Sequence, residues 1–297
     1  MKNVLIILNP CAGTKQANKN LVEIIDVFCR AGYEVVVRPT EAPGDGTEIT
    51  RQRINDFDLI VAVGGDGTFN EVIEGMLLSG VKKPMGYIPA GSTNDFASSI
   101  GLSKNVVQAA KDIVSGKVRT LDIGRFNGRY FSYVASFGAF TKVSYEAPQN
   151  IKNMLGHMAY ILEGIKDIPS IKPLRLWLKM EQGVYGGDYL FGAVCNSTSV
   201  GGLLTLSDDL VDMNDGKFEV LLIKAPSNII ELNQILIALT TQNFENSPMI
   251  SFFSSGNLEI TADADMPWTL DGEYQAGSAQ ILIENVQGAI ELIVPEK

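Results

Sequence analysis

The chain has one histidine and three cysteines. His157 alone could supply a histidine base, a Ser-His-Asp triad or a histidine metal site, and it falls within a predicted helix. Cys11, Cys29 and Cys195 are odd in number and far apart, so neither a disulfide framework nor a cysteine metal site is indicated. This cysteine usage favours a reducing cytoplasm.

Long hydrophobic runs are also lacking. No run approaches the roughly 18 apolar residues that span a membrane. The N-terminal run Val4–Leu8 ends at Asn9-Pro10 and is too short for a signal sequence. Positive charge is scarce as well, since the net charge is −10, and this argues against a general nucleic-acid binder.

The acidic excess lies in the second half of the chain. Residues 1–148 carry 16 Lys and Arg against 15 Asp and Glu, whereas residues 149–297 carry 8 against 19. This difference predicts two regions of different character.

The first 122 residues alternate strand and helix patterns, which predicts a parallel sheet with helices on both faces. Ligands bind such sheets at the carboxyl ends of the strands. The predicted strands are Val4–Leu8, Glu34–Arg38, Leu59–Val63 and Met85–Ile88, and the predicted helices are Asn18–Arg30, Thr47–Asn55, Phe69–Leu78 and Val106–Val114.

After a boundary near Leu121–Arg125 the pattern changes to consecutive strands, which favours a β-sandwich over residues 123–287. The last strand, about 288–297, could belong to the sandwich or return to the first domain of residues 1–122, and the sequence does not decide between the two. The predicted strands are Tyr130–Phe137, Pro173–Met180, Tyr189–Cys195, Phe218–Ile223, Asn257–Thr261, Ala279–Ile283 and Ala289–Val294, with helices at Ile151–Lys166 and Ile229–Leu239.

A glycine-rich turn, Gly64-Gly65-Asp66-Gly67-Thr68, follows the buried strand pattern Leu59–Val63 and leads into a helix. Glycines let the backbone turn sharply and approach a ligand. A helix N-terminus attracts anions through its amides and dipole. The turn therefore predicts a phosphate site, and Mg²⁺ would reconcile Asp66 with a bound phosphate. The alternative is a tight turn in which Asp66 caps the helix.

Two further turns follow the first and fourth predicted strands. Asn9–Lys15 could wrap a phosphate, although neither a Walker A motif nor Gly-x-Gly-x-x-Gly is present. Ser92-Thr93-Asn94-Asp95 offers hydroxyls, an amide and a second carboxylate, but these residues are also ordinary helix caps. The carboxyl ends of parallel strands share one edge, so we expect all three turns to meet there.

Two Asp-Gly pairs lie in the acidic half. Asp215-Gly216 precedes the strand Phe218–Ile223, and Asp271-Gly272 follows Trp268-Thr269-Leu270. Either pair could be an ordinary hairpin turn. Glu273 distinguishes the second pair, because a kinase without a histidine base needs one carboxylate to accept the hydroxyl proton and another to orient it or hold metal.

These motifs resemble those of the bacterial diacylglycerol-kinase-like lipid kinases, which share a catalytic domain with diacylglycerol, sphingosine and ceramide kinases. Asn9-Pro10-x-x-Gly13 is similar to the nucleotide loop of that family, Gly64–Thr68 with Asn70-Glu71 to its signature, and Asp271-Gly272-Glu273 to its distal catalytic element. Pro89–Ala97 resembles the Pro-x-Gly-Thr-x-Asn-Asp-Phe-Ala motif. Here Ser92 replaces threonine but keeps the hydroxyl.

The resemblance covers the whole chain and implies an ATP-dependent lipid kinase, most simply one that converts diacylglycerol to phosphatidic acid. It implies an α/β nucleotide domain, a β-sandwich domain and an active site in the cleft between them. It makes Asp271 the general base beside Glu273, and places Asp66 and Asp95 in a water-bridged magnesium network. ATP contacts are implied for Asn9, Pro10, Cys11, Ala12, Gly13, Thr40, Gly65, Asp66, Gly67, Thr68, Phe69, Asn70, Glu71 and Ser92.

The resemblance also implies a structural magnesium at Asp215 and the carbonyls of Asp212 and Lys217. Members of the family suggest a homodimer. A lipid substrate and the absence of a membrane segment imply a cytoplasmic protein that contacts the inner membrane surface peripherally. Lys82-Lys83 and the Arg125 and Arg129 region are candidate anchors, and the helix 151–166 could line a lipid pocket or belong to the core.

Two other functions stay open from the residues. A kinase of the NAD-kinase group also uses Gly-Gly-Asp-Gly-Thr, although the 91–96 loop has the lipid-kinase form. A non-catalytic nucleotide- or lipid-binding protein is the second, and the carboxylates Asp66, Asp95, Asp271 and Glu273 argue against it.

Overall fold

A computed structural model of the chain describes residues 2–138, 172–200, 204–207, 210–244 and 246–296. The chain divides into two compact units. Unit 1 consists of Met1–Asp122 and Gly288–Lys297, and unit 2 of Ile123–Gln287. The predicted helix over 151–166, with His157, lies outside the described residues.

Unit 1 is built on a parallel sheet of four strands, β1 (Lys2–Leu8), β2 (Tyr33–Pro39), β3 (Leu59–Gly64) and β4 (Pro84–Pro89), in the order β4-β3-β1-β2. The chain returns at its end to extend this sheet, because the last part of β17 (Gln280–Val294) pairs parallel to β4. Strands β1 and β3 are apolar nearly throughout, as expected for strands covered on both faces.

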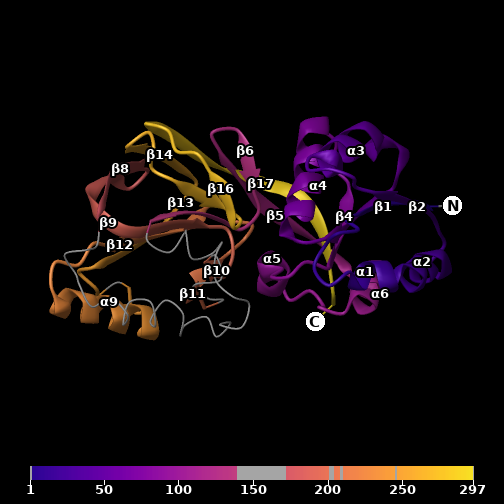
Figure 1. The fold of residues 1–297 in the computed structure, drawn as a ribbon, viewed down its shortest axis with the longest axis horizontal. Coiled ribbons are helices and arrows are strands. Elements are labelled where there is room, and N and C mark those ends of the chain that lie inside the picture. The colour runs from indigo at the N-terminus through magenta and orange to yellow at the C-terminus, as the bar shows by residue number, and fades with distance from the viewer. Residues whose placement is uncertain (1, 139–171, 201–203, 208–209, 245, 297) are drawn as a thin grey trace. The chain divides into compact units, whose positions relative to one another are not determined.

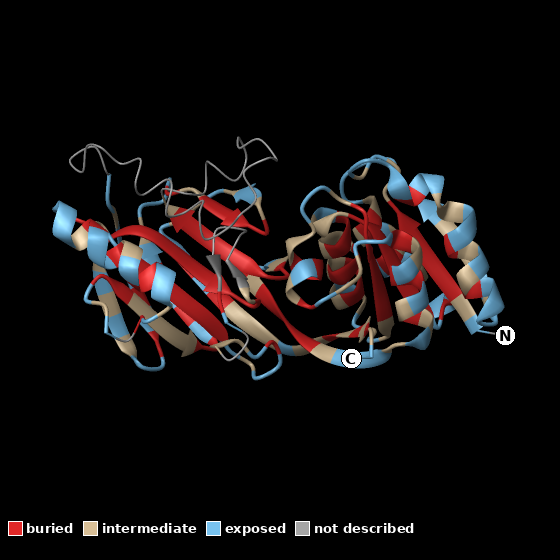
Figure 2. Cartoon of the chain, turned by 90° about the horizontal axis from the view of Figure 1, so that it is seen from below, coloured by how far each residue is buried: buried red, intermediate tan, exposed pale blue. Residues whose placement is uncertain are grey.

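Helices cover both faces of this sheet (Figure 1). Helices α2 (Leu21–Arg30) and α6 (Val106–Ser115) pack together on one face, and α3 (Asp45–Arg53) and α4 (Asp66–Ser79) on the other. Figure 2 shows the buried strands between helices whose outer faces are exposed. The short elements are α1 (Gln16–Lys19), the 3₁₀ helix η1 (Ile54–Asp56) and α5 (Asp95–Ser99).

Helix boundaries in unit 1 differ from the sequence prediction in three places, one of which is the predicted helix 47–55, observed as α3 (Asp45–Arg53) followed by η1. The predicted helix 18–30 is two helices, α1 and α2, separated at Asn20. Helix α4 begins at Asp66, not at Phe69, so the motif Asp66-Gly67-Thr68 forms its first turn. The glycine turn therefore ends at Gly65, and the residues after it already belong to the helix N-terminus.

Unit 2 is a β-sandwich whose two layers are joined by the long strand β9. The first half of β9 pairs with β8, and the second half lies between β7 and β12. Large apolar side chains fill the space between the layers, among them Leu178, Phe218 and Trp268. The elements are β5 (Lys117–Phe126), which starts in unit 1, β6 (Arg129–Phe131), β7 (Val134–Gly138), β8 (Leu174–Met180), β9 (Gly183–Cys195), β12 (Phe218–Lys224), α9 (Ile229–Thr241), β13 (Ile250–Ser255), β14 (Asn257–Ala262), β15 (Trp268–Leu270) and β16 (Glu273–Gln275), with a separate pair, β10 (Ser199–Val200) and β11 (Leu204–Thr205).

The sequence prediction of unit 2 was wrong at three points. The predicted strand 130–137 is interrupted at Ser132-Tyr133, which separates β6 from β7. The two predicted strands 279–283 and 289–294 are one continuous strand, β17. Strands β5, β13, β15 and β16 were not predicted. The interruption at Ser132 matters most for the site, because its backbone amides face Asp271.

Candidate active site

The turns that follow β1, β3 and β4 meet at one edge of the unit 1 sheet. A Cβ atom placed on Gly91 would lie 2.5 Å from the Cα atom of Gly65, and one placed on Gly13 would lie 3.0 Å from the carbonyl carbon of Gly91. Gly13 also has a φ angle of +49°. Only glycine lets the three backbones approach this closely. The structure thus brings together the turns that the sequence placed at this edge.

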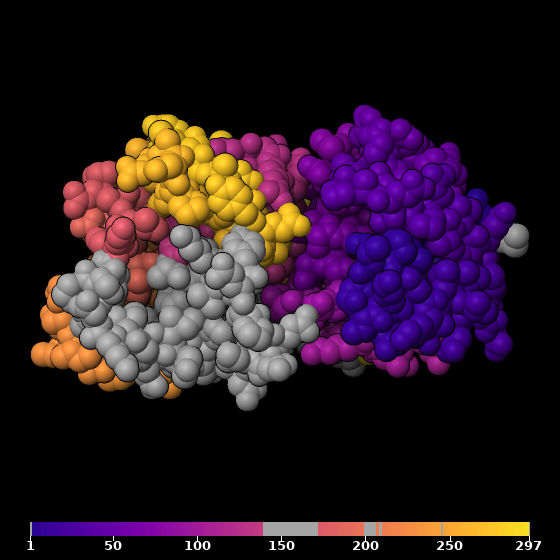
Figure 3. Space-filling model, viewed as in Figure 1, coloured from indigo at the N-terminus to yellow at the C-terminus, as the bar shows by residue number. Residues whose placement is uncertain are grey.

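Hydrogen bonds connect these turns in addition to the glycine contacts. The Asn9 side-chain amide donates to Thr68 Oγ1 at 3.2 Å, and the Ala90 amide donates to the Gly64 carbonyl at 2.7 Å. Cys11 and Gly13 are exposed, and the N-terminal segment to which they belong forms part of the visible surface of unit 1 in Figure 3. The edge is therefore a fixed backbone arrangement that solvent can reach.

The turn after β4 is folded by Asn94. This residue has a φ angle of +54°, its Oδ1 accepts from the Gly91 amide at 2.9 Å, and its Nδ2 donates to the Gly91 carbonyl at 2.9 Å. Asn94 precedes α5, but it makes no side-chain cap to that helix. Ser92 and Thr93 are exposed at the tip of the turn. The Asn94 side chain therefore shapes the loop and makes no cap bond to α5.

Asp66 opens helix α4 but does not act as its cap. The N-cap residue is Gly65, and it makes no side-chain cap bond. Asp66 Oδ2 instead accepts from the backbone amide of Asp95 at 3.2 Å, which brings the two predicted magnesium partners together. The first amides of a helix have no acceptor within it, so the start of α4 favours an anion.

Tyr87 on β4 lies beneath this edge and was not identified from the sequence. Its hydroxyl is 3.5 Å from Asp66 Oδ1 and 3.4 Å from Asn94 Oδ1. Burial, and then the negative charges of Asp66 and Asp95, hold the pKa of Tyr87 well above its usual value. Tyr87 therefore stays protonated and can donate a hydrogen bond to either side chain.

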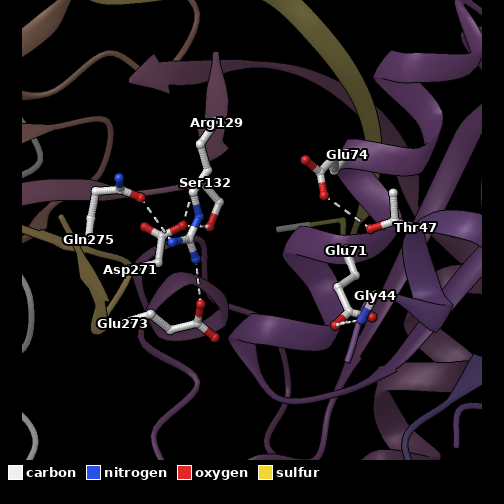
Figure 4. Close-up of polar contacts among 9 residues, drawn as sticks. All are labelled: Gly44, Thr47, Glu71, Glu74, Arg129, Ser132, Asp271, Glu273 and Gln275. Carbon is white, nitrogen blue, oxygen red and sulfur yellow. Dashed lines mark hydrogen bonds and ion pairs between the residues drawn. The ribbon is translucent and has the colours of Figure 1, made fainter. Parts of the chain in front are cut away.

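The loop that contains Thr40 is attached to the same part of unit 1. The Thr40 amide donates to the Leu8 carbonyl at 2.9 Å, at the end of β1. Glu71 on α4 accepts from the amide of Gly44 at 2.9 Å (Figure 4), and also from the amide of Gly46 at 2.9 Å. Both carboxylate oxygens of Glu71 are thus engaged with protein backbone, although the residue belongs to the predicted ATP-contacting run.

In unit 2, Asp271 occupies a two-residue hairpin turn between β15 and β16. Asp271 and Gly272 have φ angles of +50° and +85°, and Leu270 pairs with Glu273 across the turn. The Asp271 carboxylate is buried and accepts four hydrogen bonds. Its donors are the amides of Ser132, Tyr133 and Val134, at 2.5, 2.9 and 2.9 Å, and the Ser132 hydroxyl at 3.0 Å.

Glu273 stands beside Asp271 in a very different environment. Its side chain is 60% exposed and pairs with Arg129, whose Nη2 lies 2.6 Å from Glu273 Oε2. Arg129 also donates to Gln275 Oε1 at 3.1 Å (Figure 4). Of the two carboxylates, Asp271 is enclosed by backbone donors and Glu273 is open to solvent. Arg129 also has a defined partner here, so it is less available as a membrane anchor.

The loop Asp212–Lys217 in unit 2 is turned by its own carboxylates. Asp215 Oδ1 accepts from the Lys217 amide at 2.9 Å, and Asp212 Oδ1 from the Asn214 amide at 3.1 Å. Asp212, Asp215 and Lys217 are all exposed. Within the described part of the chain, no three His, Cys, Asp or Glu side chains lie close enough to hold a metal ion alone. A cation here would need backbone or amide oxygens too.

Beneath this loop lies a buried acid, Glu219, that the sequence analysis missed. Glu219 is 3% exposed, and its Oε2 has no hydrogen-bond partner among the described residues. Burial raises the pKa of Glu219 to about 8, and the charges of Asp215 and Asp212 add to the shift. Asn285 donates to the Lys217 carbonyl at 3.1 Å, while its own buried Oδ1 has no described donor. Two unsatisfied acceptor oxygens thus flank the loop.

The residues missed from the sequence share a physical reason. Tyr87, Ser132 and Glu219 lie in strands or at strand ends, where a polar side chain gives no motif of its own. The strand Phe218–Lys224 could have drawn attention to Glu219, because this residue is the one acid in the otherwise apolar, buried run Phe218–Ile223.

Comparisons with known proteins match this architecture in both units. The family described as the diacylglycerol kinase catalytic domain matches residues 3–126, and the family described as the YegS C-terminal NAD kinase beta sandwich-like domain matches residues 134–294. A diacylglycerol kinase of Bacillus subtilis is 32% identical, over 100% of this chain and 98% of that protein. A diacylglycerol kinase of Staphylococcus haemolyticus is 31% identical, over 98% of this chain and 88% of that protein.

Solved structures agree with this at the level of the fold. A Bacillus anthracis protein is 25% identical with a TM-score of 0.81, over 99% of this chain and 97% of that chain. A second structure from that organism, of a diacylglycerol kinase, is 22% identical with a TM-score of 0.75 over the same shares.

The fold, the site and these similarities together define an ATP-dependent kinase with an α/β unit and a β-sandwich unit. The chain belongs to the diacylglycerol kinase catalytic-domain family, and it is a lipid kinase. The NAD-kinase-like and non-catalytic alternatives are not favoured by these similarities. Within the described residues, no helix has both the length and the apolar character needed to cross a membrane.

Proposed function

We propose that the enzyme transfers the γ-phosphoryl group of ATP to the hydroxyl of diacylglycerol and produces phosphatidic acid, as a step of phospholipid metabolism. The observation that carries the choice of acceptor is the full-length similarity to relatives named diacylglycerol kinase. The β-sandwich unit is the proposed lipid-substrate domain, and the α/β unit is the proposed nucleotide domain.

ATP is proposed to bind at the sheet edge where the three glycine turns meet. The proposed contacts come from Asn9–Gly13, Thr40, Gly65–Asn70 and Ser92. Glu71, the last residue of the predicted run, is left out because both of its carboxylate oxygens accept from backbone amides. The support is the close approach of Gly13, Gly65 and Gly91 and the start of α4, because glycine amides and helix N-termini accommodate phosphate. Gly13, Gly65 and Gly91 leave room for backbone to approach a ligand without an intervening side chain.

The reaction is an in-line displacement at phosphorus. The lipid hydroxyl oxygen forms a bond to the γ-phosphorus, the bond from that phosphorus to the β–γ bridging oxygen breaks, and ADP leaves. The hydroxyl proton passes to a carboxylate of unit 2. Positioning of the two substrates and stabilisation of the phosphoryl charge supply most of the acceleration.

Asp271 and Glu273 are proposed to have different roles in the reaction of the lipid hydroxyl. The family resemblance makes Asp271 the base, but its four hydrogen-bond donors occupy the positions where a proton would be accepted. Glu273 is exposed and has one oxygen paired with Arg129. We therefore assign proton acceptance to Glu273 and assign to Asp271 the positioning of the hairpin that carries it.

Asp66 and Asp95 are proposed to hold Mg²⁺ through water. The residues fit this ion, because two carboxylates meet beside a phosphate-binding helix start, and Mg²⁺ prefers carboxylate, water and phosphate oxygens. When bound, the ion would neutralise charge on the transferred phosphoryl group. Tyr87 would then keep Asp66 oriented through its protonated hydroxyl.

A second, structural Mg²⁺ is proposed at Asp215 with the carbonyls of Asp212 and Lys217. The unsatisfied acceptors Glu219 Oε2 and Asn285 Oδ1 support the presence of a positive partner near this loop. Buried acceptors that lack a donor are costly, and a hydrated cation or its waters would satisfy them.

The enzyme is further proposed to be cytoplasmic, to contact the inner membrane surface peripherally and to form a homodimer. A lipid acceptor requires access to a bilayer, and this supports the peripheral contact. Co-sedimentation with phospholipid vesicles and analytical ultracentrifugation check these assignments. Protein that stays in the supernatant, or a monomer at working concentration, would contradict them.

The acceptor is tested with γ-labelled ATP and three acceptors presented separately: diacylglycerol in mixed micelles, a total lipid extract and NAD. We expect label in phosphatidic acid and none in NADP. Label in a different lipid would replace diacylglycerol as the substrate, and NADP formation would overturn the lipid class.

The two carboxylates are tested with Glu273→Gln and Asp271→Asn. Glu273→Gln should lower turnover by roughly 10²–10⁴, while ATP affinity and thermal stability stay unchanged. Asp271→Asn should also lower the melting temperature, because an amide cannot accept from all four donors. If Glu273→Gln kept near-wild-type turnover and Asp271→Asn lost it at unchanged stability, the base would be Asp271.

The structural ion is tested by melting temperature in Mg²⁺ and in chelator. An ion at 100 times its dissociation constant stabilises by about 2.7 kcal/mol, so Mg²⁺ should raise the melting temperature of the wild type by several degrees. Asp215→Asn should abolish this rise. Asp188→Asn, which alters an exposed acid of the same unit, is the control. An equal rise in all three proteins would exclude a site at Asp215.

A further inference from the structure

Glu71 connects two helices of unit 1 through backbone amides. It lies on α4, three residues after the glycine-rich motif Gly64–Thr68. One of its oxygens accepts from the Gly44 amide at 2.9 Å (Figure 4), and the other accepts from the Gly46 amide at 2.9 Å. A Cβ atom on Gly46 would lie 2.7 Å from Glu71 Oε2, so the residue at position 46 must be small for this contact to form. The carboxylate has no oxygen left without a backbone donor.

The two amides belong to the start of helix α3. Gly44 is the N-cap residue of α3 and has a φ angle of +90°. As a glycine it has no side chain that could cap the helix. The first amides of a helix need an outside acceptor, and a negative charge there interacts favourably with the helix dipole. Glu71 supplies both from α4, so it caps α3 from another helix.

This cap fixes the far end of the loop that begins at Thr40. The near end is held by the Thr40 amide on the Leu8 carbonyl, and the middle by Asp45 Oδ2, which accepts from the amides of Glu41 at 2.6 Å and Ala42 at 2.8 Å. Thr40 is a proposed ATP contact, and Gly65 at the start of α4 is another. Glu71 therefore sets the distance between two parts of the proposed nucleotide site.

We propose that Glu71 is a positioning residue for ATP, which holds the Thr40–Gly46 loop against α4 and does not contact the nucleotide itself. This proposal rests on the proposed ATP site. A carboxylate that faced the phosphates would repel them, whereas one that is bound by two amides is kept away from them. If Glu71 positions the loop, removal of its charge should weaken ATP binding. If Glu71 faces the phosphates, removal of its charge should strengthen ATP binding.

Glu71→Gln separates these roles because it removes the charge at nearly constant size. Its amide group can accept from only one of the two glycines, and its NH₂ opposes the other donor. We expect ATP binding measured by calorimetry to weaken about tenfold, with turnover at saturating ATP close to wild type. Amide hydrogen exchange at Gly44 and Gly46 should become faster.

Two more variants complete the experiment. Glu71→Asp keeps the charge but is too short for both amides, so it should weaken ATP binding as well. Glu74→Gln is the matched control: Glu74 lies one turn further along α4, its Oε2 accepts from Thr47 Oγ1 at 3.1 Å, and its neutralisation should leave ATP affinity unchanged. Parallel weakening in Glu71→Gln and Glu71→Asp supports the positioning role.

Unchanged or tighter ATP binding in Glu71→Gln, with faster exchange at Gly44 and Gly46, would overturn the proposal, because the loop would then not belong to the site. Lower turnover with unchanged ATP affinity would overturn it too and place Glu71 in the chemical step. A wild-type protein that binds no ATP would instead refute the proposed function, and calorimetry without lipid detects that case separately.

Discussion

The contact between the backbones of Gly65 and Gly91 is the constraint on which the nucleotide edge depends. Strands β3 and β4 are neighbours in a parallel sheet, so their turns leave the sheet side by side. Gly91 has no room for a Cβ, because it would lie 2.5 Å from Gly65 Cα. This close approach lets α4 begin at Asp66, with the first amides of the helix open to the edge. It also brings the backbone amide nitrogen of Asp95 within 3.2 Å of Asp66 Oδ2. The arrangement of the backbone that is proposed to bind phosphate and of the proposed metal carboxylates thus follows from one close contact.

In unit 2, a single side chain, Asp271, likewise holds a hairpin in place. Asp271 accepts from three consecutive amides: those of Ser132 and Tyr133 in the interruption between β6 and β7, and that of Val134 at the start of β7. The aspartate thus supplies acceptors to amides at a break in the strand while it anchors the β15–β16 turn. Glu273 is presented on the open side of that turn. Of this pair of carboxylates, Asp271 is buried and is proposed to position the hairpin, whereas Glu273 is exposed and is proposed to accept the proton.

Much of the fold could be predicted because unit 1 follows simple periodicity. Fully buried strands such as Leu59–Gly64 read as apolar runs, and the parallel sheet then places their turns at one edge. The periodicity of apolar residues did not predict where helices and strands are interrupted. Asn20 separates α1 from α2, and Ser132-Tyr133 separates β6 from β7, and both breaks occur within sequences that look continuous.

The sequence could predict which residues belong to the site, but not which groups those residues contact. The sequence marks Asp66, Glu71 and Asp271 by their motifs. It does not show that Asp66 binds the amide of Asp95, or that Glu71 caps a helix that begins 26 residues earlier. Such partners are separated by many residues and depend on tertiary packing, so no local pattern carries them. Glu219 and Tyr87 were missed for the same reason.

The most direct measurement of this account is ATP binding by the Gly91→Ala variant, followed by calorimetry with Mg²⁺ present and with circular dichroism as the check on folding. The added methyl group must separate the Gly65 and Gly91 turns, so we predict a folded protein whose ATP affinity falls at least about tenfold, the equivalent of 1.4 kcal/mol. A folded Gly91→Ala protein with wild-type ATP affinity would contradict the account, because ATP would then bind somewhere other than the edge that these glycines form.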